Sequence, residues 1–223
     1  MGPANTLRIS SVFIELVDTL RCPRDHEDTW LVAAVEVLHG RHIARGSLGC
    51  PVCKTQYPVV NGAVDFTGAL KELASEAGML VAVFSAEEIF RLRALLDLGE
   101  PGGVVLLTGS AAPLVAALEA SVQVSWLVAN PTGISAQPGV STVWIGDRVP
   151  VSPGSLRGAV VGDLVSDGLL ASVVLALRPR GRLVAPADVA VPVNVLELAR
   201  DDRQWVGERT GGRISAPVQL HRA

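Results

Sequence analysis

The stretch between residues 101 and 184 most constrains the fold, because short apolar runs alternate there with turn and helix signals. From Pro101 to Gly146 the sole charged residue is Glu119. Prolines and glycines divide this stretch into pieces shorter than the roughly 20 apolar residues that a membrane-spanning helix needs. Short apolar runs between turn signals fit buried strands, and strands that alternate with helices predict a parallel, doubly wound α/β sheet.

The expected strands and helices follow from these runs. The strands are Val104–Leu107, Val122–Val128, Thr142–Ile145, Ala159–Val161 and Gly181–Val184, and the helices are Pro113–Ala120 and Leu164–Leu177. Near the end, Gln204–Arg209 and Ile214–His221 flank Thr210-Gly211-Gly212, which predicts an antiparallel hairpin that closes the sheet.

The first 66 residues have a different pattern and predict a small β module. Apolar residues at helical spacing predict a short helix over Ser11–Leu20, and Trp30–Leu38 with His42–Leu48 predict a hairpin. Gln56–Val60 is a further strand, before the Asn61-Gly62 turn. Residues 67–98 form a helical connector, in which Ser85-Ala86-Glu87-Glu88 fits a capping box. We therefore expect three parts, at residues 1–66, 67–98 and 99–223.

Composition narrows the classes of partner. The chain has 223 residues, of which 49% are hydrophobic and 18% charged, with a formal net charge of −3. Such a chain can bury a core, and it lacks the basic footprint with which proteins neutralise nucleic-acid phosphates. No secretory signal is visible at the N-terminus, and the three cysteines favour metal ligation over a disulfide framework. We expect a cytoplasmic protein that spans no membrane and binds no nucleic acid.

The cysteines predict a metal site. Cys50 and Cys53 have the C-x-x-C spacing of a zinc-binding pair, and Cys22 stands alone in the first half-site. The fourth ligand is either Asp25, at the position of the second cysteine, or His26 one residue later. Motif register favours Asp25. The alternative is a hairpin that folds without metal, with the cysteines as small buried apolar residues.

The cysteine module resembles a known family. Leu20-Arg21-Cys22-Pro23, then Cys50-Pro51-Val52-Cys53, then the run from Tyr57 to Phe66 are similar to the small zinc-ribbon family of methyltransferase activator proteins. The resemblance covers about residues 16–66. It implies a zinc-bound ribbon that stabilises class I methyltransferases through a strand and an apolar surface, without catalysis of its own.

The second half of the chain resembles UbiE-like methyltransferases. The run from Gly146-Asp147 to Val161, and Leu177-Arg178-Pro179 with Gly181-Arg182-Leu183, are similar to segments of that family. The resemblance implies a class I sheet that holds S-adenosylmethionine at the carboxyl ends of its strands, with Asp147 near the adenine. A turn residue is the alternative role for Asp147.

Two other loops depart from the UbiE-like pattern. After the first strand, Gly109 is the one glycine of an expected series and no acid precedes it; after the second strand, Asn130 stands where a carboxylate would hold the ribose. Asn130 cannot supply a charged bidentate acceptor. The connections Thr132–Ser141 and Arg148–Gly158 also leave little room for crossover helices. We therefore expect a reduced Rossmann-like domain.

Selective loss of cofactor loops favours a binding, scaffold or regulatory role over catalysis. On this hypothesis the chain is a methyltransferase-like pseudoenzyme with a ribbon in cis, and it has a protein partner or forms a homo-oligomer. The alternative is an active S-adenosylmethionine-dependent methyltransferase whose acceptor the sequence does not name.

Overall fold

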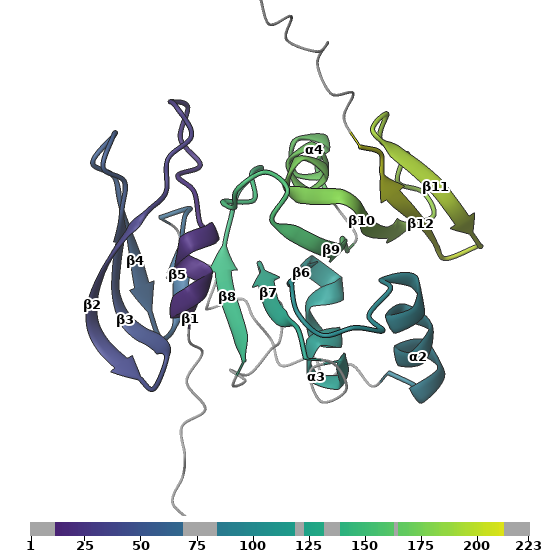
Figure 1. Ribbon diagram of the computed structural model, residues 1–223, viewed down its shortest axis with the longest axis horizontal. Coiled ribbons are helices and arrows are strands. Elements are labelled where there is room, and N and C mark those ends of the chain that lie inside the picture. Colours follow the sequence, from purple (N-terminus) through teal and green to yellow (C-terminus); the bar gives the residue numbers. More distant parts are fainter. Residues whose placement is uncertain (1–11, 69–83, 119–122, 132–138, 163–164, 212–223) are drawn as a thin grey trace, which may run out of the picture.

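The computed structural model describes residues 12–68, 84–118, 123–131, 139–162 and 165–211. Within these residues, strands from both halves of the chain join one 12-stranded sheet, in the order β1-β3-β4-β5-β8-β7-β6-β9-β10-β12-β11, with β2 paired to β3 (Figure 1). The strands are β1 Val12–Phe13, β2 Val32–His39, β3 His42–Gly49, β4 Gln56–Val60, β5 Ala63–Asp65, β6 Val104–Thr108, β7 Ser125–Ala129, β8 Val140–Trp144, β9 Leu156–Val160, β10 Leu177–Pro186, β11 Val195–Arg200 and β12 Gln204–Arg209.

The five central strands confirm the predicted doubly wound sheet. Strands β8, β7, β6, β9 and β10 are parallel neighbours, and the chain reverses its direction of winding between β6 and β9. This reversal is the topological switch point, outside which α/β proteins form ligand crevices. The strand class was predictable because apolar residues dominate each run, as in a sheet covered on both faces.

Helical elements cover the two faces of this sheet. They are η1 Ile14–Thr19, α2 Ala86–Leu95, η2 Gly109–Leu114, α3 Val115–Leu118 and α4 Asp167–Ala176. Alternate residues of one strand enter different cores: Leu106 packs with η1 and α4, whereas Val105 and Leu107 pack with α2 and α3. Such alternation places the two cores on opposite faces. None of the helices in the described residues is both long and apolar enough to cross a bilayer.

The N-terminal β module, residues 12–66, is called the ribbon below. Its β2–β3 hairpin and β4 confirm the sequence expectation. The expected helix over Ser11–Leu20 is instead a 3-10 helix that begins after β1, because Val12 and Phe13 pair with Ile43 and His42 of β3.

The ribbon extends the parallel sheet directly. Strand β5 of the ribbon pairs in parallel with β8, from Ala63 opposite Thr142 to Asp65 opposite Trp144. The backbone N–H of Phe66 continues the contact by donating to the carbonyl of Trp144 at 2.9 Å. Residues 84–211, which carry strands β6 to β12, are called the sheet domain. The two parts therefore share one hydrogen-bonded sheet.

The ribbon also covers part of one face of the parallel sheet, where no crossover helix lies. The connection between β8 and β9 contains no helix, and η1 packs on the sheet face beside it. Leu16 and Leu20 of the ribbon enter one core with Leu127 and Val143 of the sheet domain. Backbone bonds fix this layer: Arg21 N–H donates to the Pro150 carbonyl, and Ser152 N–H to the Thr19 carbonyl, both at 2.8 Å.

Several expectations about elements need correction. Helix α2 has the predicted capping box between Ser85 and Glu88, while the earlier part of the expected helix, residues 69–83, lies outside the described residues. The expected helix over Pro113–Ala120 is divided into η2 and α3, with Pro113 inside η2.

The expected C-terminal hairpin is also different. Strand β12 pairs with β10 and β11, and Ile214–His221 lies outside the described residues. Strand β11 escaped prediction because it is a sheet edge, where Glu197 and Arg200 break the apolar pattern.

Candidate metal centre and sheet-edge site

Four side chains of the ribbon converge on one point. The ligand atoms of Cys22, His26, Cys50 and Cys53 all lie within 4.8 Å of one another. Cys22 follows the bridge between Leu20 and Val151. Cys50 and Cys53 stand in the turn that joins β3 to β4. Cys22 and Cys50 are 28 residues apart in the sequence, so the two half-sites meet only when the hairpin folds.

Two separations within this cluster are close to those of tetrahedral zinc. Zinc–sulfur bonds of about 2.3 Å and zinc–nitrogen bonds of about 2.0–2.1 Å place two sulfurs about 3.8 Å apart, and sulfur and nitrogen about 3.6 Å apart. The Cys22 and Cys53 sulfurs are 3.7 Å apart. Cys50 Sγ lies 3.4 Å from His26 Nε2. This Cys₃His cluster therefore fits a zinc ion.

His26 is oriented by its neighbour. Its Nδ1 lies 2.6 Å from the carbonyl of Glu27, so the Nδ1–H tautomer donates there and leaves Nε2 free to face the sulfurs. The pKa of His26 is raised, chiefly by this hydrogen bond. A backbone carbonyl behind the imidazole is the usual support of a metal-binding histidine.

Asp25 lies outside the cluster, contrary to the preference that motif register gave it. Its carboxylate is exposed and pairs with Arg148 of the sheet domain, 2.8 Å from Nη1. The same guanidinium lies 3.4 Å from the Pro23 carbonyl. The chain between Cys22 and His26 turns Asp25 towards the β8–β9 connection, which motif register does not report. His26, the alternative ligand, occupies the fourth corner.

The thiols of the cluster differ in environment. The hydroxyl and backbone N–H of Thr55 lower the pKa of Cys53 to about 6. Burial raises the pKa of Cys22, against the effect of the Tyr57 hydroxyl 3.1 Å from its sulfur. Burial also raises the pKa of Tyr57, which keeps this phenol neutral beside Cys22. The sequence did not predict that Thr55 and Tyr57 contact the thiols of the cluster, although both lie within four residues of Cys53.

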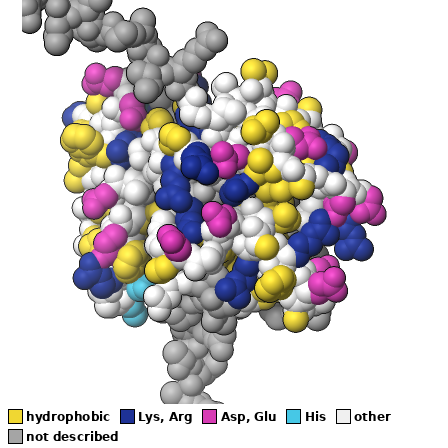
Figure 2. All heavy atoms as spheres, turned by 45° about the vertical axis from the view of Figure 1, so that its right-hand side comes forward, with side chains coloured by type: hydrophobic (Ala, Val, Ile, Leu, Met, Phe, Trp, Pro, Cys, Tyr) yellow, Lys and Arg dark blue, Asp and Glu magenta, His cyan; other side chains and the backbone are white. Residues whose placement is uncertain are grey.

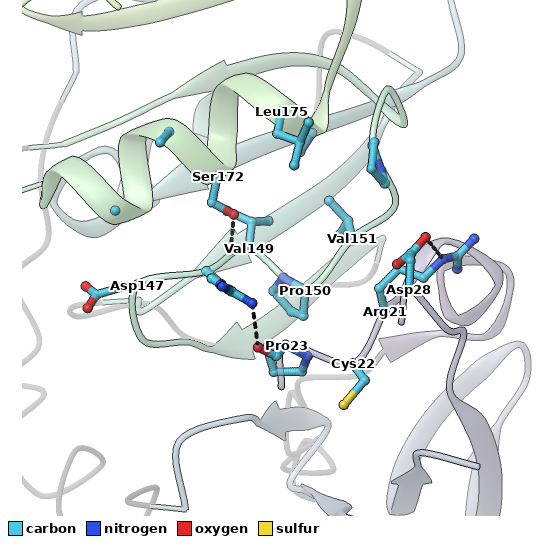
Figure 3. A pocket seen from close by; sticks show the side chains of 15 residues that line it. Arg21, Cys22, Pro23, Asp28, Asp147, Val149, Pro150, Val151, Ser172 and Leu175 are labelled. Carbon is cyan, nitrogen blue, oxygen red and sulfur yellow. Dashed lines mark hydrogen bonds and ion pairs between the residues drawn. The ribbon is translucent and has the colours of Figure 1, made fainter. Parts of the chain in front are cut away.

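A groove separates the ribbon from α4 (Figure 3). It has a volume of about 580 Å³ and extends from Asp147 along α4 to Leu175, with Cys22 and Pro23 on the ribbon side. Three polar contacts join residues of its walls: Val149 N–H donates to Ser172 Oγ at 2.9 Å, Arg21 pairs with Asp28 at 3.6 Å, and Arg148 donates to the Pro23 carbonyl at 3.4 Å. A smaller cavity of about 390 Å³ lies on the other side of Arg148, lined by Tyr57 and Phe66.

The three candidate cofactor residues lie at the carboxyl ends of three neighbouring strands. Gly109 follows β6, Asn130 follows β7, and Asp147 comes after β8. The structure therefore places them along one edge of the sheet, as the parallel order requires. The three residues differ in the contacts that they make.

Asn130 is bound to the chain itself. It has a φ of 51°, a left-handed conformation that asparagine tolerates better than most residues. Its Oδ1 accepts from the N–H of Ile145 at 2.8 Å, and its Nδ2 donates to the carbonyl of Ile145 at 2.9 Å. Both polar atoms of the amide thus bind the backbone that follows β8.

The loop after β6 packs against the loop after β9. Gly109, with a φ of 54°, turns the chain directly into η2, where Ala111 and Ala112 are buried. A Cβ added to Gly162 would lie 2.6 Å from the backbone nitrogen of Ser110 and 2.8 Å from the Thr108 carbonyl. The N–H of Gly162 also donates to the Thr108 hydroxyl at 3.4 Å. Backbone therefore meets backbone at the switch point.

Asp147 is the most accessible of the three. It is exposed, and Oδ1 accepts from the Ser166 hydroxyl at 2.8 Å, where Ser166 caps α4. Gly146 beside it has open space at the position of a side chain. Gly109 and Asn130 line neither the groove nor the smaller cavity, whereas Asp147 lines both.

Comparison with known proteins identifies the ribbon. Residues 14–62 match the family model described as Trm112p-like protein. This Trm112p-like segment holds all four residues of the cluster and ends just before β5. No curated protein matches the chain.

Several solved structures that resemble the chain are methyltransferases by description. A proposed S-adenosyl-L-methionine-dependent methyltransferase from Methanococcus maripaludis has 10% identity and a TM-score of 0.44, over 56% of this chain and 86% of that one. The antibiotic-resistance methyltransferase Kmr has 13% identity and a TM-score of 0.38, over 61% and 98%. Geranyl diphosphate C-methyltransferase from Streptomyces coelicolor has 13% identity and a TM-score of 0.35, over 44% and 43%.

Proposed function

We propose that this protein is a methyltransferase-like binding or scaffold protein with an activator-type ribbon built into its own sheet. The observation that carries the proposal is the packing of Gly162 against Thr108 and Ser110 at the switch point. A cofactor held there needs room between these loops and free polar groups to bind it. Here Gly162 lies against the backbone of Thr108 and Ser110, and the Asn130 amide is bound to Ile145, which supports the proposal.

The ribbon acts in cis on this proposal. An activator of the kind that the resemblance implies binds a methyltransferase through a strand and an apolar surface. Here β5 pairs with β8, and Leu16, Val17 and Leu20 are buried against the sheet domain. These surfaces are no longer open to a second protein, so any protein partner binds elsewhere.

Calorimetric titration with S-adenosylmethionine and S-adenosylhomocysteine tests the loss of cofactor binding. We expect no saturable heat from either compound at micromolar concentrations. The matched variant is Asp147→Ala, because Asp147 is the accessible residue at this edge. If the wild-type chain binds either compound in the low micromolar range and Asp147→Ala does not, the proposal is wrong.

An active S-adenosylmethionine-dependent methyltransferase of unknown acceptor is the second candidate. It is favoured by one observation: Asp147 and the open space at Gly146 remain at the carboxyl edge, beside cavities that could admit a ligand. On this alternative Asp147 contacts the adenine, and Asp147→Ala abolishes binding.

We also propose that Cys22, His26, Cys50 and Cys53 hold one zinc ion. The support is the convergence of the four ligand atoms, with one sulfur–sulfur and one sulfur–nitrogen separation close to those of tetrahedral coordination. A bound zinc would cross-link the two half-sites of the ribbon and contribute to its folding. Because such thiolates persist in reducing compartments, we further propose a cytoplasmic location.

A further inference from the structure

Each sulfur of the metal centre has a hydrogen-bond partner of its own. Cys22 Sγ lies 3.1 Å from the Tyr57 hydroxyl, and Cys53 Sγ lies 3.2 Å from the Thr55 hydroxyl. The backbone N–H of Cys53 donates to Cys50 Sγ at 3.4 Å. Cysteines bind zinc as thiolates, which have no proton to give. With a metal bound, the two hydroxyls can therefore contact these sulfurs only as donors.

The metal centre carries negative charge that such donors offset. Two positive charges on zinc and three thiolates leave one negative charge when the histidine is neutral. Two arginines beside Cys22 in the groove, Arg21 and Arg148, are already paired with Asp28 and Asp25. On the face that Figure 2 shows, acidic and basic side chains also lie next to one another. Hydrogen bonds to sulfur therefore have to supply part of the offset.

We propose that Tyr57 is a positioning residue of the metal centre, whose hydroxyl donates to the Cys22 thiolate and thereby strengthens zinc binding. The proposal rests on the zinc ion proposed above. Tyr57 is 4% exposed, and its ring packs against Phe66 with the ring centres 4.8 Å apart. Its backbone is fixed in β4, opposite Leu48 of β3. The ring is thus held by strand pairing and by packing, and its hydroxyl is held beside Cys22.

The two hydroxyls of the centre differ in their access to water. Cys53 is exposed and Thr55 is half-buried, so water can donate to Cys53 Sγ if the Thr55 hydroxyl is removed. The buried ring of Tyr57 has a different effect, because a phenylalanine ring in its place would still fill the space beside Cys22. Water is then kept from the position of the lost oxygen, and the thiolate loses a donor without replacement. The Tyr57 hydroxyl should therefore contribute more to zinc binding than the Thr55 hydroxyl does.

Competition between the full chain and a zinc chelator of known affinity tests the strength of binding. Tyr57→Phe should raise the zinc dissociation constant about tenfold or more, as the loss of an outer-shell partner typically does. Thr55→Val is the matched control, because it removes the other hydroxyl and keeps the shape of the side chain. It should change the constant less than about threefold, since water replaces the lost donor.

Cobalt in place of zinc tests the hydrogen bond itself. A donor withdraws charge from sulfur, so Tyr57→Phe should move the thiolate-to-cobalt charge-transfer band to longer wavelength, while Thr55→Val leaves it near the wild-type position. The chain contains a single tyrosine, so biosynthetic replacement of tyrosine by 3-fluorotyrosine changes Tyr57 alone. The fluorinated phenol is a stronger donor and should move the band to shorter wavelength. This second measurement decides the question if Tyr57→Phe does not fold.

The outcomes separate this proposal from the zinc centre on which it rests. An unchanged band in Tyr57→Phe, or in the fluorinated chain if that variant does not fold, overturns the proposal even where zinc binding weakens, because Tyr57 then acts through packing alone. An unchanged zinc dissociation constant in Tyr57→Phe overturns it too, as does an equal loss in Thr55→Val. A wild-type chain that binds neither zinc nor cobalt contradicts the metal centre itself, and this proposal with it.

Discussion

Asn130 binds the chain's own backbone at the position where the resemblance implies a ribose-binding carboxylate. Its amide both donates to and accepts from Ile145. A carboxylate has no donor and cannot reproduce this pair. Both polar atoms of the amide therefore stabilise the turn after β8.

Asn130→Asp should lower the free energy of unfolding by about 1–3 kcal/mol without creating a cofactor site. The second carboxylate oxygen would face the Ile145 carbonyl, which would lose its half-buried donor. Backbone strain does not change, because aspartate also tolerates positive φ. Urea unfolding measures the loss. Asn194→Asp is the control, since Asn194 is exposed and uses its backbone carbonyl alone, so its change should stay within about 0.5 kcal/mol. A stabilised Asn130→Asp variant that binds S-adenosylmethionine would contradict this account.

His26→Ala should reduce zinc affinity by more than about 100-fold, beyond the effect of losing an outer-shell partner. Asp25→Ala should leave the zinc content near one per chain, because its carboxylate pairs with Arg148 away from the cluster. Elemental analysis after dialysis against a chelator compares the two variants with the wild-type chain. Full zinc in His26→Ala together with loss in Asp25→Ala would restore the motif-register assignment.

At the scale of elements, the strands of the central sheet were predictable and their partners were not. Each apolar run has the length of a buried strand, and local pattern suffices to locate it. The pairing of β5 with β8 joins residues almost 80 positions apart, so no local signal reports it. Strand β11 escaped prediction because a sheet edge tolerates charged residues that blur the alternation.

The candidate site was also predictable only in part. Cys22, Cys50 and Cys53 were found from spacing, because zinc ligands need fixed short separations along the chain. The fourth ligand depends on how one turn directs two adjacent side chains, which spacing does not determine. The packing of Gly162 against Ser110 depends on two loops more than 50 residues apart, and sequence pattern carries no information on that distance.

Helix α2 is tied to the turn between β11 and β12 through Asp201. The Asp201 carboxylate pairs with Arg91 of α2 and accepts from the backbone N–H groups of Arg203 and Gln204. These contacts, Arg91 first, lower the pKa of Asp201 to about 2. In the unfolded chain the pKa is about 3.9. The stabilisation is therefore complete above about pH 4 and is lost as the pH falls towards 2.

Arg91→Ala should raise the pKa of Asp201 towards its unfolded value. The contribution of Asp201 to the free energy of unfolding should then be smaller and should be lost at a higher pH. NMR titration of the Asp201 carboxyl carbon measures the shift directly. Arg24→Ala is the control, because Arg24 is an exposed arginine of the ribbon and should leave the pKa of Asp201 unchanged. An Asp201 pKa near 2 in Arg91→Ala would show that the backbone donors alone hold it there.

At the scale of the whole molecule, the ribbon is a layer of the fold. The core that lies under η1 and α4 contains Leu16 and Leu20 of the ribbon together with Leu127 and Val143 of the sheet domain. Burial of each large aliphatic side chain is worth roughly 1.5–3 kcal/mol, so several such residues rival the total stability of a domain. The sheet domain without the ribbon would expose this face and the edge of β8.

Residues 67–223 expressed alone should therefore aggregate, and addition of residues 1–66 should restore solubility. Light scattering of the separate and mixed fragments measures this. Leu20→Ala in residues 1–66 should weaken the rescue, because Leu20 is fully buried at the junction; Val60→Ala is the control, since Val60 is 41% exposed on β4. Two fragments that stay soluble and monomeric and do not associate would contradict the shared core.

The full chain should unfold in one transition in which zinc release and loss of sheet structure coincide. One sheet, and one of its two cores, connect the ribbon to the parallel strands, so neither part has a separate boundary at which unfolding could stop. Trp126 and Trp205 are buried in the sheet domain, and their fluorescence reports its unfolding. Trp30→Phe removes the exposed tryptophan of the ribbon from that signal.

A colorimetric chelator reports zinc release across the same guanidinium titration. We expect equal midpoints, because loss of the ribbon exposes the face that Leu16 and Leu20 cover. Zinc release at clearly lower denaturant, with tryptophan fluorescence still native, would mean that the ribbon unfolds as an independent domain.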